Sequence, residues 1–206
     1  MNSNSNYSDH DILPNIKKSS LSLFLYLTKL QIRSIGPTIF VIALLMSLAY
    51  NWVLYDNLFV LDEMLLSVLL GMVFLIIGAI IHEFSHAAAG IRLKGSDFLW
   101  RIRTNRKAGL VMVRFSKDIP TNSNEKTIVL LAGSSFTLLF GLLMFVIAFL
   151  LNIKIYYYFP ILAFCFPNIM SLIPRKNTDG AKIKQQSRRD RSLFSLAIQS
   201  IKEVFL

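Results

Sequence analysis

Cysteine and acidic residues are scarce in this chain, and the common nucleic-acid-binding motifs are missing from it. The one cysteine, Cys165, excludes an intramolecular disulfide and any metal motif built on cysteine pairs. Lys and Arg number 22 against 12 Asp and Glu, but no RNP, zinc-knuckle or helix-turn-helix pattern accompanies this positive charge. We therefore expect no nucleic-acid partner. The basic residues flank apolar segments and are expected to face anionic lipid headgroups instead.

Long apolar runs account for a hydrophobic content of 54% and favour a membrane protein over a soluble domain. Four runs come close to the ~20 residues that cross a bilayer core, at about 37–55, 65–91, 128–151 and 155–173. Nine Lys and Arg lie between the second and third runs and eight follow the fourth, whereas the other two connections hold only Lys154. This alternation predicts an all-α polytopic membrane protein with about four transmembrane helices and both termini cytoplasmic. Its expected location is a bacterial cell membrane.

The remaining segments divide the chain into three regions. Residues 1–34 are predicted to form a flexible polar tail and an interfacial amphipathic segment, 35–180 an intramembrane domain with its core at 65–180, and 181–206 a basic cytoplasmic tail with an amphipathic helix. Between the second and third runs, alternating residues at 98–104 and 110–115 predict a small membrane-associated β-hairpin. A solvated basic loop is the alternative for that connection.

Two of the three histidines lie in the motif His82-Glu83-Phe84-Ser85-His86, inside an apolar run. Ionisable groups in such a run are costly and therefore indicate function. The H-E-x-x-H spacing puts two imidazoles one helical turn apart, where both can bind one zinc ion. Glu83 can then act as the catalytic base on zinc-bound water. We expect one zinc ion per chain.

A catalytic zinc site usually has three protein ligands, so a third residue is needed. His10 lies in the polar tail, and Glu125 and Glu203 belong to charged segments. Asp179 follows the fourth run, which crosses the membrane in the same direction as the run that carries His82 and His86. An Asp-Gly pair alone would indicate a tight turn. The matching depth instead favours Asp179 as the third metal ligand.

With these residues the chain resembles the site-2 protease family of intramembrane zinc metalloproteases over about residues 65–180. That family pairs HExxH with a later NxxPxxxxDG motif, and Pro174-x-x-x-x-Asp179-Gly180 keeps the spacing from proline to aspartate. Ser171 stands at the family's Asn position, and Asn168 one turn earlier is a candidate to replace it in positioning substrate.

A second family feature is a helix that begins with Ala-Gly, and Ala132-Gly133 matches it. Here Ser134 replaces the usual Pro and Thr137 the usual Asn. No PDZ or CBS domain is evident, so the resemblance is to a compact, divergent member.

The resemblance implies a zinc-dependent intramembrane endopeptidase that cleaves a membrane-embedded or membrane-associated peptide or protein. The main alternative is a non-proteolytic zinc-binding membrane protein that binds a peptide or confers immunity. The departures at Ser171, Ser134 and Thr137 favour that alternative. The intact Glu83 disfavours it, because structural zinc needs no base. A metallopeptidase with a downstream Glu as third ligand, and a transporter, are weaker alternatives, the latter because no inverted repeat is evident.

Overall fold

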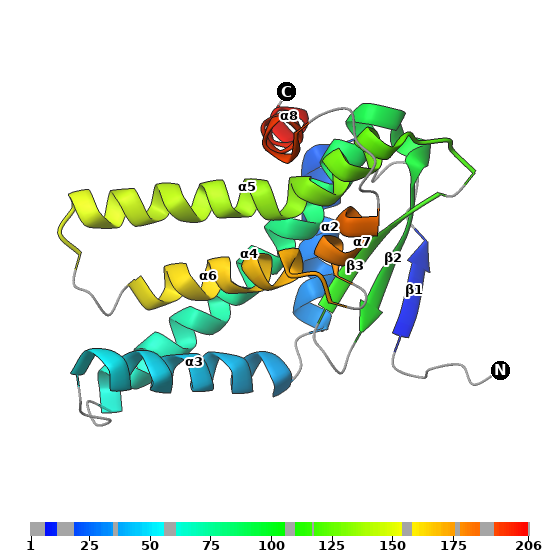
Figure 1. Ribbon diagram of the computed structural model, residues 1–206. Helices are drawn as coiled ribbons and strands as arrows, with labels where there is room; N and C mark the ends of the chain where they lie inside the picture. Colours follow the sequence, from blue (N-terminus) through cyan, green and yellow to red (C-terminus); the bar gives the residue numbers. More distant parts are fainter. Residues whose placement is uncertain are drawn as a thin grey trace.

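The computed structural model describes residues 7–11, 19–34, 37–55, 61–105, 110–116, 118–153, 158–175, 178–185 and 192–205. It is mostly helical, with one small antiparallel sheet at one end (Figure 1). The elements are β1 (Tyr7–Asp11), α2 (Ser20–Arg33), α3 (Pro37–Tyr55), α4 (Leu61–Lys94), the 3₁₀ helix η1 (Ser96–Phe98), β2 (Leu99–Asn105), β3 (Leu110–Phe115), α5 (Ser123–Leu150), α6 (Tyr158–Leu172), α7 (Asp179–Gln185) and α8 (Leu193–Phe205).

The helices predicted at the four apolar runs are all present, as α3, α4, α5 and α6. Among the described residues, two segments are long and apolar enough to cross a membrane: Val68–Lys94 of α4 and Ser123–Leu150 of α5. In α3 and α6 the described apolar segments are shorter. In Figure 1, α3, α5 and α6 run in similar directions and α4 crosses them obliquely. The helix α4 contacts all three, so it is the central helix of the bundle.

The predicted β-hairpin is confirmed, since β2 and β3 pair antiparallel with Ile102 opposite Val113. The expectation of a flexible polar tail at the start of residues 1–34 was wrong for Tyr7–Asp11, which pair antiparallel with β2 as a third strand. The register sets Asp9 opposite Arg103 in the ladder. This short polar strand lacks an alternating apolar pattern, so only its pairing with β2 reveals it.

One hydrophobic cluster holds the sheet against α2 and α4. Its buried members are Leu23, Leu27 and Leu30 of α2, Ala87 of α4, Leu99 and Ile102 of β2, and Val111 of β3. The ring of Phe24 also meets that of Phe84 edge-on, with centroids 5.5 Å apart. Because Phe84 and Ala87 belong to the turn of α4 that carries the H-E-x-x-H motif, this cluster fixes the hairpin beside that motif.

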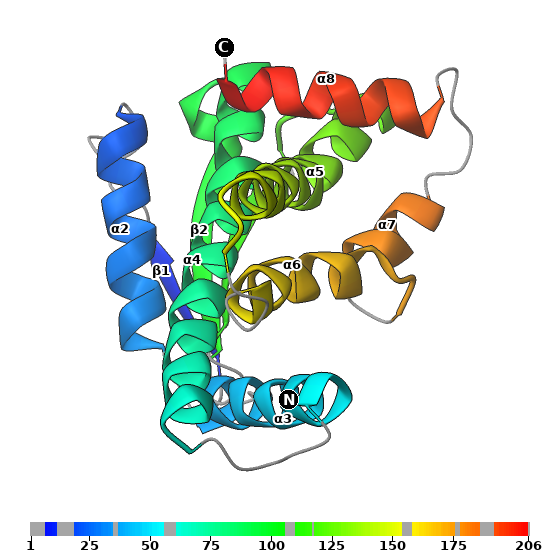
Figure 2. The ribbon, with the colours of Figure 1, turned by 90° about the vertical axis from the view of Figure 1, so that its left-hand side faces the viewer.

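The two amphipathic segments form the helices α2 and α8, and both lie across the bundle. In Figure 1 α8 is seen end-on while α5 runs across the view, and in Figure 2 the reverse holds. The helix α2 stands upright in both views, so it too crosses the direction of α5. Buried Leu196 joins α8 to a cluster with α5 and α7, while Phe194 remains 76% exposed. Each helix therefore keeps one face on the protein and turns another outward.

Candidate metal centre

The helix α4 supplies two nitrogen donors on one face. Unbroken helical geometry from Leu61 to Lys94 brings residues four apart together, and the Nε2 atoms of His82 and His86 are 3.0 Å apart. Their rings are nearly perpendicular, with centroids separated by 4.5 Å. Both rings therefore present the same nitrogen to the same point.

A turn after α6 brings Asp179 to that point. The hydroxyl of Thr178 donates to the carbonyl of Ile173 at 2.7 Å and accepts from the backbone N–H of Arg175 at 3.0 Å, which closes the turn. Gly180 is required there, because a Cβ at this position would overlap the Leu172 carbonyl. The carboxylate of Asp179, at the first residue of α7, consequently faces α4.

Asp179 Oδ2 lies 3.4 Å from His82 Nε2 and 3.3 Å from His86 Nε2. Its other oxygen, Oδ1, accepts a hydrogen bond from Lys182 Nζ at 3.1 Å. Burial opposes ionisation of Asp179, but where His86 and His82 are protonated, their charges and hydrogen bonds outweigh it and lower the pKa of this carboxyl well below its usual range. Asp179 is therefore a carboxylate, with one oxygen held outward and one directed at the histidines.

The helices α5 and α6 fix the far sides of the two rings. His86 Nδ1 donates to the carbonyl of Val129 at 2.6 Å, and His82 Nδ1 lies 2.6 Å from Asn168 Oδ1. Gly133 of α5 faces the rings directly, and a Cβ there would lie 2.6 Å from His86 Nε2. The close approach of α5 to the donors therefore depends on glycine at this position.

The three donors can hold a metal ion. The ligand atoms of His82, His86 and Asp179 all lie within 4.8 Å of one another. The carbonyl oxygen of Val129 can only accept, so Nδ1 of His86 must carry the proton of this hydrogen bond. In a neutral imidazole, Nε2 then has a lone pair. Lone pairs that converge in this way repel unless a cation lies between them. A tetrahedral zinc ion, with ligands at about 2.0–2.1 Å, needs donors about 3.3–3.4 Å apart, and the carboxylate–imidazole distances fit this spacing.

Glu83 lies next in the chain to His82 but makes its hydrogen bond with the hairpin. Its Oε2 accepts from the backbone N–H of Val113 at 2.8 Å. Among the described strands β3 pairs only with β2, so this N–H belongs to the free edge of the sheet. The carboxylate of the predicted base is thus joined to the edge of β3.

The other site candidates have different partners. Ser171 Oγ pairs with Ser134 Oγ at 2.8 Å, so two positions that depart from the family motifs contact each other across α5 and α6. Glu125 pairs with Lys94 at 2.8 Å and caps α5, and Glu203 pairs with Arg92 at 3.5 Å. Neither glutamate joins the group of metal donors. The side chain of His10 lies outside the described residues.

Several groups at the site were not predicted as functional. The N–H of Val113 and the carbonyl of Val129 are backbone atoms, for which no residue type gives a signal. Lys182 could have been found, because residues three apart on a helix face one another and Lys pairs with Asp at that spacing. Gly133 was noted only as part of the family resemblance, and its contact with the two rings emerges from the packing of α5 on α4.

Comparisons of the chain with protein-family models, curated proteins and solved structures gave no match. Function is therefore inferred from the chemistry of the site.

Proposed function

We propose that this protein is a zinc-dependent intramembrane endopeptidase. The observation that carries the proposal is the convergence of Asp179 Oδ2 with His82 Nε2 and His86 Nε2 of α4, the helix that also carries Glu83. Two imidazoles and one carboxylate are a ligand set suited to zinc, and a fourth position is left for water or substrate. One zinc ion per chain would be held by these three residues. When bound, zinc supplies a Lewis acid that acidifies water and polarises a peptide carbonyl.

The residues of the chain itself account for the proton transfers. Glu83 takes a proton from the attacking water as the oxygen of that water joins the carbonyl carbon of the peptide. The carbon–nitrogen bond then breaks, and Glu83 passes the proton to the departing amine nitrogen. Before reaction the N–H of Val113 donates to this carboxylate at 2.8 Å and holds it in place. Val129 and Asn168 keep the histidine rings in place throughout.

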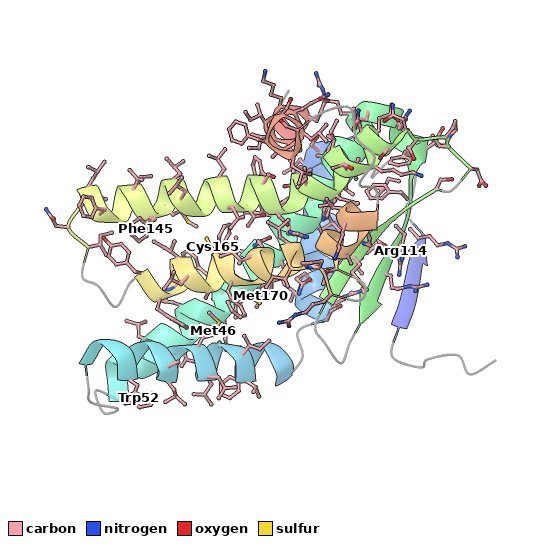
Figure 3. The ribbon with its side chains drawn as sticks, in the orientation of Figure 1. Met46, Trp52, Arg114, Phe145, Cys165 and Met170 are labelled. Atoms are coloured by element: carbon pink, nitrogen blue, oxygen red, sulfur yellow. The ribbon has the colours of Figure 1, made fainter. Side chains whose placement is uncertain are left out.

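An apolar surface supports a membrane setting for this chemistry. Exposed apolar side chains cover four helices, and they include Val41 and Leu45 of α3, Leu69 and Val73 of α4, Leu142 and Phe149 of α5, and Leu162 and Phe166 of α6. So many exposed apolar side chains are unusual in water, and lipid chains would cover them. Figure 3 labels Trp52 and Phe145 toward the end of the bundle away from the sheet, and Arg114 on the sheet itself.

We accordingly infer four transmembrane helices, α3 to α6, with α2 and α8 lying in the cytoplasmic interface and both termini in the cytoplasm. The orientation of α2 and α8 supports this, since both run across the direction of α5, and a helix that lies across the spanning helices lies along the membrane plane. The polar sheet and the metal donors then share the cytoplasmic side of a bacterial cell membrane, where water is available.

The proposed substrate is a membrane-embedded or membrane-associated peptide or protein. A transmembrane helix must unwind locally before its carbonyls can react, because they are hydrogen-bonded within the helix. An unwound segment needs partners for its backbone, and the free edge of β3 beside Glu83 offers a place for strand addition.

The proposal is tested by profiling new peptide termini in membranes of cells that produce either the wild-type chain or Glu83→Gln. Glutamine keeps the size of the side chain and an oxygen that can accept from Val113, but it cannot take up the proton. We expect termini within or beside transmembrane segments that occur only with the wild-type chain. Identical terminus profiles in the two cultures, with equal amounts of both proteins, would overturn the assignment as a protease.

A non-proteolytic zinc-binding membrane protein remains the second candidate. One observation favours it: the carboxylate of Glu83 is bonded to the backbone of Val113, as a structural residue would be. In that case Glu83→Gln would preserve biological function together with zinc binding, which separates the two candidates.

A further inference from the structure

Asn168 is a deeply buried polar residue that contacts one of the metal donors. It lies on α6 and is 1% exposed, and its Oδ1 is 2.6 Å from Nδ1 of His82, a residue 86 positions earlier. A buried amide without partners would cost free energy, so the partners of both its ends are informative.

The orientation of this amide follows from the carbonyl of Phe164, which lies 2.9 Å from Asn168 Nδ2. A carbonyl oxygen can only accept, so the amide must turn its NH₂ group toward Phe164. The amide oxygen then faces His82. Since that oxygen also can only accept, Nδ1 of His82 must be the donor and must carry a proton.

The tautomer of His82 determines what its other nitrogen can do. A neutral imidazole with its proton on Nδ1 has a lone pair on Nε2. Nε2 is the atom directed at Asp179 Oδ2, at 3.4 Å, and at His86 Nε2, at 3.0 Å. The bond with Asn168 thus leaves the metal-facing nitrogen unprotonated and restrains the rotation of the ring.

We propose that Asn168 is a positioning residue of the metal centre, which fixes the tautomer and orientation of His82 through Nδ1, and that it is not a substrate-binding residue. This inference rests on the proposed zinc centre. The amide oxygen and nitrogen of Asn168 both have partners within the protein, whereas a substrate-positioning side chain would direct one of these atoms at the substrate. Removal of a hydrogen-bond partner of a metal-binding histidine typically lowers metal affinity by about 10–100-fold.

Two variants of the full-length, detergent-purified protein test the proposal. Asn168→Leu keeps the approximate volume but removes the acceptor. Asn168→Asp keeps an acceptor for His82 Nδ1 and loses the donor to Phe164. The matched control is Ser171→Ala, one turn along α6, which breaks the bond with Ser134 and does not touch a metal donor. The measurements are zinc affinity by competition with a chelator, and the tautomer of His82 by ¹⁵N NMR of histidine-labelled, metal-free protein.

We expect zinc affinity to fall by about 10–100-fold in Asn168→Leu and to change by less than about threefold in Asn168→Asp and Ser171→Ala. In the metal-free protein, His82 should be protonated on Nδ1 in the wild-type chain and should lose that preference in Asn168→Leu. Unchanged affinity in Asn168→Leu, or an equal loss in Asn168→Asp, would overturn the proposal. An equal loss in Ser171→Ala would attribute the effect to general packing and would overturn it as well.

Failure of this inference and failure of the proposed function are distinguishable. If the wild-type chain binds no zinc, the proposed function fails, while the NMR measurement still decides whether Asn168 sets the tautomer. If the wild-type chain and Asn168→Leu bind zinc equally, only the role of Asn168 is lost.

Discussion

Replacing Gly133 with alanine adds one methyl group at the place where α5 touches the two metal-binding rings. The new Cβ would lie 2.6 Å from His86 Nε2 and 2.9 Å from His82 Cε1, whereas ordinary contacts begin at 3.4 Å. The first contact is thus 0.8 Å too short (3.4 minus 2.6), so the rings or α5 must move apart by about that distance. Metal–ligand distances tolerate only about ±0.2 Å, so the required movement exceeds the tolerance about fourfold.

The same substitution should leave the fold largely intact. Alanine is favoured over glycine within a helix by roughly 1 kcal/mol, and overpacking of a core typically costs about 1–3 kcal/mol. The net destabilisation is therefore about 0–2 kcal/mol, which a folded protein can tolerate, whereas the effect on the ligands is direct. We expect zinc affinity to fall by at least about 100-fold. This loss exceeds the one expected when a hydrogen-bond partner of a ligand is removed, because here the donors themselves are displaced.

Chelator competition on the purified, folded protein provides the assay. Gly71→Ala is the matched control, because its added methyl group meets the ring of Phe159 between α4 and α6 and does not meet a metal donor. Zinc affinity of Gly71→Ala should stay near that of the wild-type chain. Wild-type affinity in folded Gly133→Ala would refute the reasoning, and so would an equal loss in both variants.

Two further predictions concern the third ligand and the base. Asp179→Ala should remove zinc from the purified protein. Glu125→Ala should keep one zinc ion per chain, although it loses the pair with Lys94 and the cap of α5. Metal analysis of both variants separates them, and full zinc occupancy in Asp179→Ala would exclude Asp179 as a ligand. Val113→Pro removes the N–H that holds Glu83 without breaking the ladder to β2, because proline is tolerated at a free edge. Peptide cleavage should then fall by about 10–100-fold through misplacement of the base, with unchanged zinc content, while Val113→Ala should cleave normally. Equal cleavage by Val113→Pro and Val113→Ala would show that this N–H does not position the base.

The helices and the hairpin were predictable because each has a regular pattern of side chains. The four apolar runs gave helices, and the alternation at 98–104 and 110–115 gave the two paired strands. The strand at Tyr7–Asp11 was missed because its polar residues form a ladder only once β2 is in place. Helices follow from local sequence, whereas this strand depends on a partner more than ninety residues away.

The metal donors were predictable for a similar reason. His82 and His86 share a helical spacing. Asp179 could be proposed because two runs expected to cross a membrane in the same direction would end on the same side of it. Partners that depend on the packing of separate helices could not be assigned. Asn168 was a candidate for substrate contact until its bond with His82 was observed.

The most direct test of zinc-dependent hydrolysis uses a peptide identified from the terminus profiles and the wild-type protein reconstituted in liposomes. Cleavage is measured before removal of metal with a chelator, after removal, and during stepwise return of zinc. We expect cleavage to disappear on removal and to recover fully at one zinc ion per chain, while Glu83→Gln binds the same amount of zinc and remains inactive. Cleavage that survives removal of the metal, or that Glu83→Gln performs at the wild-type rate, would contradict the assignment of a zinc peptidase.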